Sequence, residues 1–238
     1  MSKDLLISQS LLKDYEDYLF GGMCGLYFQK IYFFGMKSKR LTSKEMRLGQ
    51  WFEYKAFGGL PVYGDKPKPD YYVQGPNKGF VTDEFERAEV QAENARELLE
   101  AHEFKVKHVS PEMVFENSVT HMDLICTDMK ETVFRDRKEV ANPDFLLEVI
   151  MDLKYTGLLE DKWKDIGWHL DSLPEKRKLM LQPTHYKWVY AAKKKRIPTF
   201  YFALFSSKAD LDRKLIRVNM DPELISKHED YVEKAYDE

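Results

Sequence analysis

One apolar run constrains this chain most strongly, because residues 145–154 read Phe-Leu-Leu-Glu-Val-Ile-Met-Asp-Leu-Lys. Its length and aliphatic side chains are typical of a strand in the middle of a sheet, covered on both faces. Since side chains alternate along a strand, Asp152 and Lys154 point to the same side. A carboxylate and an ammonium in so apolar a strand need each other, a metal ion or a charged ligand to offset their desolvation. The run therefore predicts either a plain ion pair or part of a polar site.

The segments around this strand alternate between helical and strand periodicity, which predicts an α/β fold. Ser8 is placed to cap a first helix, and Thr42 with Glu45 forms a capping box for a later one. Pro183 is expected at the first position of another helix, where its missing N–H is tolerated. We expect helices at 9–20, 43–57, 83–102, 159–170, 183–193 and 222–236, and strands at 104–109, 120–126, 131–134, 145–155, 199–205 and 214–219. Residues 26–34 fit a strand or a helix, and 60–81 a surface loop or short hairpin. This order predicts a mixed central sheet with helices on both faces.

The length and charge suit a single globular domain. The chain has 238 residues, with 37 Lys+Arg against 40 Asp+Glu and a net charge of −3. We expect one domain over 1–238, with a helical N-terminal part (about 1–102), a core (about 103–206) and a C-terminal strand-helix extension (about 207–238).

The cysteine content points to a reducing compartment. Cys24 and Cys126 are too few for a disulfide framework or a four-thiolate cluster, so each is expected to be a buried free thiol. The N-terminus has no secretory signal pattern, and the longest apolar stretches fall far below the ~20 residues of a transmembrane helix. We therefore expect a cytoplasmic protein without a membrane partner.

Two further carboxylates are candidates to join Asp152 and Lys154. Asp123 follows the Thr-His-Met run of a neighbouring predicted strand, where it would lie beside Asp152. Two carboxylates and a lysine at strand ends suit Mg²⁺, which binds through one or two carboxylates together with phosphate oxygens. On the helix at 43–57, Glu53 shares a face with Gly49 and Ala56, and such small residues allow close approach to a sheet.

A polar pair and a basic run mark the helix at 183–193 and its borders. Gln182 and Tyr186 are four residues apart and share one helix face. Lys193, Lys194, Lys195 and Arg196 follow at its end. Such a run is usually a solvated face, but it can also contact a phosphate backbone.

Taken in order, these pieces resemble the PD-(D/E)XK nuclease superfamily, and specifically its RecB-like branch of phage-type exonucleases and CRISPR-associated adaptation nucleases. The matching elements are Gly49-Gln50-Trp51-Phe52-Glu53, Asp123, Asp152-Leu153-Lys154 and Gln182-Pro183-Thr184-His185-Tyr186. The segments Ser8–Leu12 and Cys24–Tyr27 are similar to the opening of such domains. The resemblance covers about residues 8–205 and implies a restriction-endonuclease-like mixed central sheet flanked by helices on both faces.

The resemblance implies a catalytic set of Glu53, Asp123, Asp152 and Lys154. Asp123, Asp152, the backbone carbonyl of Leu153 and Glu53 would bind Mg²⁺ or Mn²⁺, and Lys154 would orient the attacking water. Hydrolysis of a phosphodiester needs a nucleophile near neutral pH and a counter-charge for the transition state, and a metal with a lysine supplies both. Gln182, Tyr186 and the run Lys193–Arg196 would contact nucleic acid.

The implied function is a metal-dependent nuclease that hydrolyses DNA, most simply an exonuclease of recombination, repair or phage DNA processing. Its partners would be single- or double-stranded DNA and a recombination or replication protein, in a bacterial cell or a phage-infected host. The oligomeric state stays open. Two other functions fit the sequence: an inactive nuclease-derived module that binds DNA or protein, and an acidic interaction protein whose motifs are coincidental.

The sequence departs from the family pattern at several places. Met122 stands where the family has a proline, and a longer connection than usual joins Asp123 to Asp152, which predicts an extended hairpin carrying Arg135, Arg137 and Lys138. The four cysteines of an iron–sulfur cluster are absent, so no cluster is expected. Glu148 shares a face with Asp152 but lies about 13 Å away at strand rise, too far for the same metal shell, so we expect it to be the partner of a buried basic group or a charge at the strand edge.

Overall fold

The protein is built on two mixed sheets and a separate hairpin. The computed structural model describes residues 6–34, 36, 43–58, 80–129, 132–135, 138–141, 148–157, 159, 177–220 and 222–237. The helices are α1 (Gln9–Leu19), α2 (Gly25–Tyr32), α3 (Lys44–Phe57), α4 (Asp83–Ala101), α5 (Arg177–Lys194) and α6 (Pro222–Asp237). The strands are β1 (Ile7–Ser8), β2 (Phe104–Val109), β3 (Glu112–Phe115), β4 (Ser118–His121), β5 (Leu124–Asp128), β6 (Thr132–Arg135), β7 (Lys138–Ala141), β8 (Glu148–Thr156), β9 (Thr199–Ser206) and β10 (Arg213–Val218).

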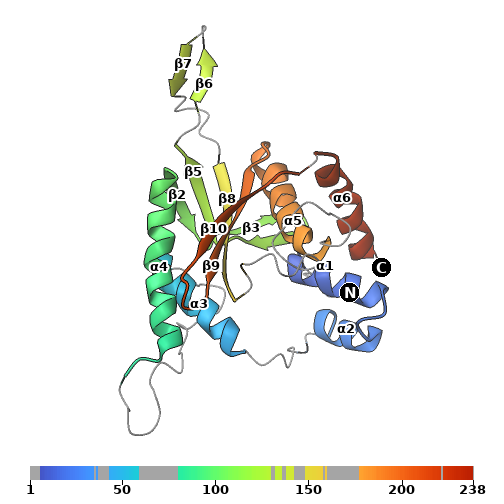
Figure 1. Ribbon diagram of the computed structural model, residues 1–238. Coiled ribbons are helices and arrows are strands. Elements are labelled where there is room, and N and C mark those ends of the chain that lie inside the picture. The colour runs from blue at the N-terminus through green and yellow to red at the C-terminus, as the bar shows by residue number, and fades with distance from the viewer. Residues whose placement is uncertain are drawn as a thin grey trace.

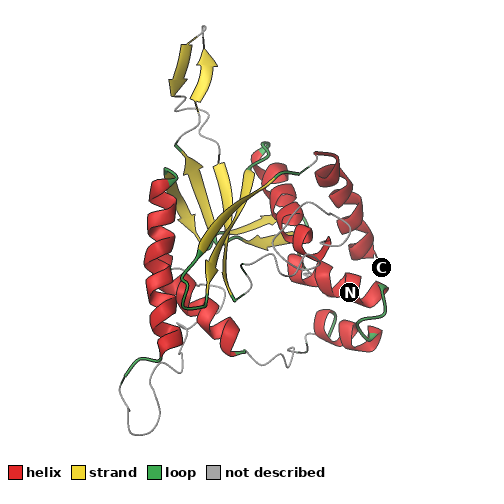
Figure 2. Ribbon diagram, in the orientation of Figure 1, coloured by secondary structure: helices red, strands yellow, loops and turns green. Residues whose placement is uncertain are grey.

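The larger sheet has the order β10-β9-β8-β5-β2, with β8 at its centre. Strand β8 runs parallel to β9 and antiparallel to β5. Helices α3 and α4 cover one face of the sheet, while α1, α5 and α6 lie on the other side (Figures 1 and 2). The predicted α/β class with helices on both faces is therefore confirmed.

The alternation of β8 divides the core into two layers. Val149, Met151 and Leu153 pack with α3 and α4, whereas Ile150 packs with α1, α5 and α6. All four side chains are at most 3% exposed. Asp152 falls on the α5 side by the same alternation, so a buried carboxylate enters this layer of the core.

The expected strand at 120–126 is wrong as one element. The chain forms β4 up to His121 and β5 from Leu124, and these strands belong to different sheets. Strand β4 pairs with β3 and, in parallel, with β1, so the N-terminal segment enters the smaller sheet. At the change of sheet, the Met122 N–H donates to the Pro111 carbonyl at 3.1 Å, a bond that a proline at 122 could not make.

Helix α5 differs from its prediction at the N-terminal end. It starts at Arg177, so Pro183 lies inside the helix and not at its first position. Proline lacks the N–H of an internal helical residue, and the adjacent Thr184 hydroxyl donates to the Met180 carbonyl at 2.7 Å. Tertiary packing of this helix against β8 and α6 overrides the local break.

Most other predicted elements are confirmed, with small changes. Residues 26–34 resolve as helix α2, and the N-cap of α3 is Ser43, whose Oγ accepts from the Met46 N–H at 3.2 Å. The 131–134 strand is half of the β6–β7 hairpin. Cys126 is buried as expected, but Cys24 is exposed, and both are free thiols. The predicted 159–170 helix, nearly all of the 60–81 loop, and the side chains of Arg135, Arg137 and Lys138 lie outside the described residues.

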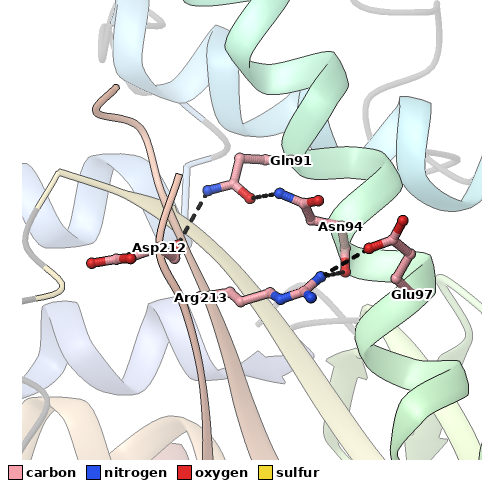
Figure 3. A network of polar contacts seen from close by, with 5 residues as sticks. All are labelled: Gln91, Asn94, Glu97, Asp212 and Arg213. Atoms are coloured by element: carbon pink, nitrogen blue, oxygen red, sulfur yellow. Dashed lines mark hydrogen bonds and ion pairs between the residues drawn. The ribbon is translucent and has the colours of Figure 1, made fainter. Parts of the chain in front are cut away.

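A polar network fixes α4 to the far end of the sheet (Figure 3). The buried Gln91 amide donates to the carbonyls of Ser206 and Asp212, at 2.9 and 3.2 Å, in the turn between β9 and β10. Asn94 donates to Gln91, and Arg213 donates to the Asn94 carbonyl at 3.0 Å. Helix α4 is thereby held on the sheet by hydrogen bonds as well as by apolar packing.

Candidate active site

A cleft with a cavity of about 310 Å³ opens where the two sheets meet. Its lining includes Glu53 from α3, Asp123 before β5, and Asp152 and Lys154 from β8. We call these four residues the carboxylate cluster. They come from three segments that are distant in sequence, and the structure brings all four together.

The position of Asp123 follows from the change of sheet. The β5–β8 pairing ends at Leu124 and Met151, because the chain leaves this sheet at Asp123. The Asp123 carboxylate supplies the hydrogen-bond acceptor that β5 no longer provides beyond this point, because its Oδ2 accepts from the backbone N–H of Leu153 at 2.6 Å. This bond fixes the carboxylate beside the C-terminal half of β8.

Asp152 is the most enclosed member of the carboxylate cluster, with 1% of its surface exposed. Its Oδ1 accepts from the Gln182 amide at 2.5 Å, and its Oδ2 pairs with the Lys154 ammonium. Gln182 also donates to the Tyr186 hydroxyl at 3.3 Å. Gln182 and Tyr186 line the cleft, so the polar face predicted for this helix points at the carboxylates.

Helix α5 runs antiparallel to β8 with a matched spacing of polar contacts. Gln182 bonds Asp152, and eight residues later the Tyr190 hydroxyl donates to Glu148. Eight residues of helix rise about 12 Å, and the four residues from Glu148 to Asp152 span about 13 Å of strand. Side chains along one face of α5 therefore hydrogen-bond to both Asp152 and Glu148, the two acids on this face of β8.

Glu148 lies outside the cleft lining, as expected. Its Oε1 is 3.4 Å from the ammonium of Lys107, and its Oε2 accepts from Tyr190. A basic partner is therefore present on strand β2, but it is partly exposed and not buried as the first alternative required.

Glu53 reaches the cleft from the opposite side of the sheet. It follows Phe52, which is fully buried and stacks on Tyr155 of β8 at 5.3 Å between ring centroids. The predicted small-residue face is only partly correct: Ala56 is buried, but a Cβ on Gly49 would meet no atom within 4 Å. The aromatic packing of Phe52, and not the glycine, positions this glutamate.

The carboxylate cluster is electrostatically unbalanced, with three acids against one ammonium. Burial, with the nearby Asp152, raises the pKa of Glu53 to about 7 against the attraction of Lys154. Burial, Asp152 and Glu53 raise the pKa of Asp123 well above its ordinary value. Burial would lower the pKa of Lys154, but the carboxylates of Asp152 and Asp123 outweigh it and keep the ammonium charged.

The donor set suits a hard divalent cation chemically. Carboxylate oxygens are the ligands that Mg²⁺ and Mn²⁺ prefer, and a cation would offset the surplus negative charge. Within the described residues, however, no group of three or more His, Cys, Asp or Glu side chains is already arranged to hold a metal ion. Each Asp152 oxygen has one contact, with Lys154 or Gln182, so lone pairs remain on both oxygens for a cation.

The basic run Lys193–Arg196 lies away from the cleft. It occupies the exposed end of α5 just before β9, whose first residue pairs with Val149 at the start of β8. Asp152 lies in the middle of β8, and Lys154 in its C-terminal half. The structure therefore separates these four side chains from the acids, and Lys193 instead donates to the Val114 carbonyl at 3.2 Å.

Several lining residues were not predicted, whereas His121, two residues before Asp123, is a sequence candidate for a contact near the site or for a core or rim position. The cleft is also lined by Ser8, Gln9, Ser10, Ser110, Val119, Thr120, His121 and Met122. Ser8 was identified as a helix cap and as part of a segment similar to the opening of the family's domains, and neither signal says what the helix start faces. Pairing of β1 with β4, which brings this helix start to the cleft, has no clear signal in two residues of sequence.

Comparison with known proteins gives a guide to the fold from solved structures. No protein-family model matches the chain, and no curated protein matches it. A crystal structure of a Eubacterium rectale protein named "Putative exonuclease" matches with a TM-score of 0.61 and 16% identity, covering 97% of this chain and 78% of that chain. The two proteins therefore share the mixed α/β fold. Separately, no helix in the described part of the chain is long and apolar enough to cross a membrane.

Proposed function

We propose that this protein is a metal-dependent nuclease that hydrolyses DNA phosphodiester bonds, as an exonuclease of recombination, repair or phage DNA processing. The observation that carries the proposal is the convergence of Glu53, Asp123, Asp152 and Lys154 in one cleft. Support for the fold comes from the Eubacterium rectale structure, whose name describes an exonuclease. The spacing of the motifs, which resemble the RecB-like branch, supports the finer assignment.

The residues divide the chemistry among them. Asp123, Asp152, the Leu153 carbonyl and Glu53 would hold Mg²⁺ or Mn²⁺, which when bound lowers the pKa of water and neutralises the charge that develops on phosphate. Lys154, held as an ammonium, orients the attacking water and stabilises its hydroxide. Burial and Asp152 raise the pKa of Glu53 to about 7 in the absence of a cation, and a bound cation would favour its ionised form.

The contacts of Gln182 and Tyr186 support a specific proposal for their role. Because Gln182 donates to Asp152 and Tyr186 adjoins it, we propose that the pair positions this carboxylate beside bound nucleic acid. The exposed run Lys193–Arg196 would act only on more distant parts of a long substrate.

A second function, binding of DNA without cleavage, is favoured by one observation. Lys154 and Gln182 already engage both oxygens of Asp152, which is how an inactive site would be stabilised. Such a module would bind DNA in a salt-sensitive way but leave it intact. An acidic interaction protein would not bind DNA at all.

The deciding experiment is cleavage of end-labelled single- and double-stranded DNA with Mg²⁺, Mn²⁺ or EDTA. The wild type is compared with Asp152→Asn and Lys154→Ala, and with Glu148→Gln as the matched control on the same strand face. Metal-dependent degradation that both cluster variants lose and the control keeps would support the nuclease. DNA binding without cleavage in all proteins would support the binding module instead.

A further inference from the structure

The hairpin formed by α1 and α2 exposes a large amount of apolar surface. Of the fifteen large apolar side chains that are exposed in the described part of the chain, seven lie between residues 18 and 36. Three of them, Phe20, Leu26 and Phe34, are 76%, 59% and 76% exposed. The same stretch contains a single charged residue, Lys30. We call the seven residues the apolar patch: Tyr18, Leu19, Phe20, Leu26, Phe33, Phe34 and Met36.

The turn between the two helices has a fixed backbone. The Asp17 carbonyl accepts from the N–H groups of Gly22 and Met23, at 2.7 and 2.9 Å. A Cβ on Gly25 would lie 2.9 Å from the ring of Tyr18, so the absence of a side chain lets α2 begin this close to α1. The exposed side chains are therefore carried by a defined hairpin and not by a fraying end of the chain.

The aromatic rings of the hairpin lie in contact with one another. Tyr18 stacks on Phe28 with 5.6 Å between ring centroids, and Phe28 contacts Phe33 at 6.4 Å. Tyr18 and Phe33 also line a cavity of about 90 Å³ between α1, α2 and Ala235 of α6. Helix α2 lies at the outer edge of the molecule, on the far side of α1 from α5 (Figure 1). Since α1 is only about 16 Å long, the whole hairpin fits within the footprint of one protein interface.

The exposed area of the apolar patch is close to what one subunit contributes to a stable dimer. Weighting about 200 Å² for each large apolar residue by its exposed fraction gives roughly 750 Å². The largest apolar patch on a typical monomer measures about 300–600 Å², whereas a stable interface buries about 800 Å² on each partner. A patch of this size in contact with water favours association.

We propose that the apolar patch is the interface of a two-fold dimer of this chain. In such a dimer the same surface of each copy meets itself, so two apolar patches match without any pattern of charges. Surfaces that bind nucleic acid or membranes are instead rich in Lys and Arg, and Lys30 is the only basic residue within this stretch. The cavity beside Tyr18 and Phe33 is then filled by an apolar side chain of the second copy. The inference is independent of the proposed function, because it uses no residue of the carboxylate cluster.

Sedimentation equilibrium of the full chain over a wide range of concentration tests the proposal. The wild type should be a dimer that dissociates on dilution. The double variant Phe20→Ser, Phe34→Ser should associate at least about a hundredfold more weakly, because two aromatic contacts of the interface are lost. Both positions are exposed in the single chain, so the variant should fold as the wild type does, which thermal unfolding checks.

The matched control is the double variant Phe80→Ser, Ile197→Ser. These side chains are 70% and 50% exposed but lie outside the hairpin. The control removes a similar amount of exposed apolar surface, and its association should equal that of the wild type.

Cys24 gives a second readout that does not depend on mass. Its free thiol is exposed in the turn between Phe20 and Leu26, whereas Cys126 is buried. A thiol reagent should modify Cys24 more slowly as the concentration of wild-type protein rises, because dimer formation covers the turn. In the Phe20→Ser, Phe34→Ser variant the rate should not depend on protein concentration.

Three results would overturn the proposal. The first is a wild type that stays monomeric at every concentration, and the second is a dimer that the patch variant retains or that leaves Cys24 fully reactive. The third is a monomeric wild type whose affinity for single-stranded DNA or for anionic lipid vesicles is lost in the patch variant, which would make that ligand the true occupant. The basic residues at 37–40, which lie outside the described residues, stay unchanged in every variant. None of these measurements uses cleavage, so the dimer can fail while the nuclease stands, and the reverse.

Discussion

Helix α5 separates two buried polar groups of opposite character. One side of the helix, with Gln182 and Tyr186, faces the carboxylate cluster. The other carries His185, whose Nδ1 is 3.1 Å from Nε2 of His228 on α6. We call these two histidines the imidazole pair. Both groups have strongly shifted pKa values, yet only one of them lines the cleft.

The imidazole pair is buried, and both ring nitrogens of His185 have partners. His185 Nε2 lies 3.2 Å from the Val119 carbonyl, which can only accept, so this nitrogen donates and Nδ1 accepts from His228. Burial lowers the pKa of His185 to about 4, and burial with the neighbouring His185 lowers that of His228 to about 3. Both rings are therefore neutral and serve to join α5, α6 and β4.

The comparison shows what a shifted pKa does and does not indicate. Burial raises the pKa values of the acids in the carboxylate cluster and lowers those of the histidines in the imidazole pair, since it disfavours the charged form in both. The carboxylate cluster differs in keeping a surplus of like charge beside a cavity. A cavity and unbalanced charge, rather than the shift alone, mark the functional candidate.

The largest expected effect is loss of cleavage in Asp152→Asn. The amide keeps the shape of the carboxylate but not its charge, so cleavage should fall by at least about a hundredfold. The thermal midpoint should change little in comparison. Cleavage and thermal unfolding of the variant are measured in parallel to check this. If Asp152→Asn were strongly destabilised while its folded fraction still cleaved DNA, the carboxylate cluster would have the structural role and not the catalytic one.

His228→Ala should show the opposite behaviour. Losing the ring leaves a cavity and an unpaired nitrogen on His185, which should lower the free energy of unfolding by about 2–3 kcal/mol. Cleavage by the folded fraction should be unchanged. Urea unfolding measures the effect, with Lys227→Ala as the exposed neighbour that should stay within about 0.5 kcal/mol of wild type. If His228→Ala were as stable as Lys227→Ala, the imidazole pair would have no structural role.

The two groups should act oppositely on stability as pH changes. The neutral imidazole pair loses its stabilisation as pH falls from about 6.5 to about 4, because the unfolded histidines take up protons first. Glu53, with its pKa raised from 4.5 to about 7, makes folding less favourable as pH rises through that range.

Glu53→Gln isolates this second effect. The variant should exceed the wild type in stability above about pH 7 by about 1–3 kcal/mol, and match it below about pH 4.5. Its stability should therefore fall more steeply on acidification. Urea unfolding between these pH values measures the difference, and parallel curves for the two proteins would show that Glu53 is not buried beside the other acids.

The smallest effect is expected for Glu148→Gln. The amide still accepts from Tyr190, and a partly exposed pair with Lys107 contributes at most about 1 kcal/mol. Cleavage should stay within about twofold of wild type. A loss as large as that of Asp152→Asn would mean that the reactive part of β8 is nearer to its N-terminal end.

Local patterns predicted the chemistry of the cleft better than its shape. The alternation of β8 was enough to pair Asp152 with Lys154, and helical periodicity was enough to place Gln182 with Tyr186. Neither pattern carries information on where a strand changes sheet. The break at Met122 and Asp123, and the seating of Ser8 beside Val119, depend on tertiary pairing and were missed.

The same limit explains the error at Pro183. Proline favours a helix start in an isolated segment, but here α5 extends to Arg177 because its N-terminal turns pack on the core through Met180 and Leu181, which are 6% and 7% exposed. Local preference is a weak force when packing opposes it. Pro183 does favour a helix start locally, but tertiary packing of the preceding turns outweighs this preference.

The convergence of distant segments in the cleft has a consequence for the protein's synthesis. Asp123 and Leu153 are thirty residues apart in the chain, and Asp152 and Gln182 are again thirty apart. Such long-range pairs form late in folding, after the entropy of closing the intervening loops has been lost. Helix α5 and strand β9 follow Lys154 in the chain, so the cleft is complete only after these later segments have been made and have folded onto β8.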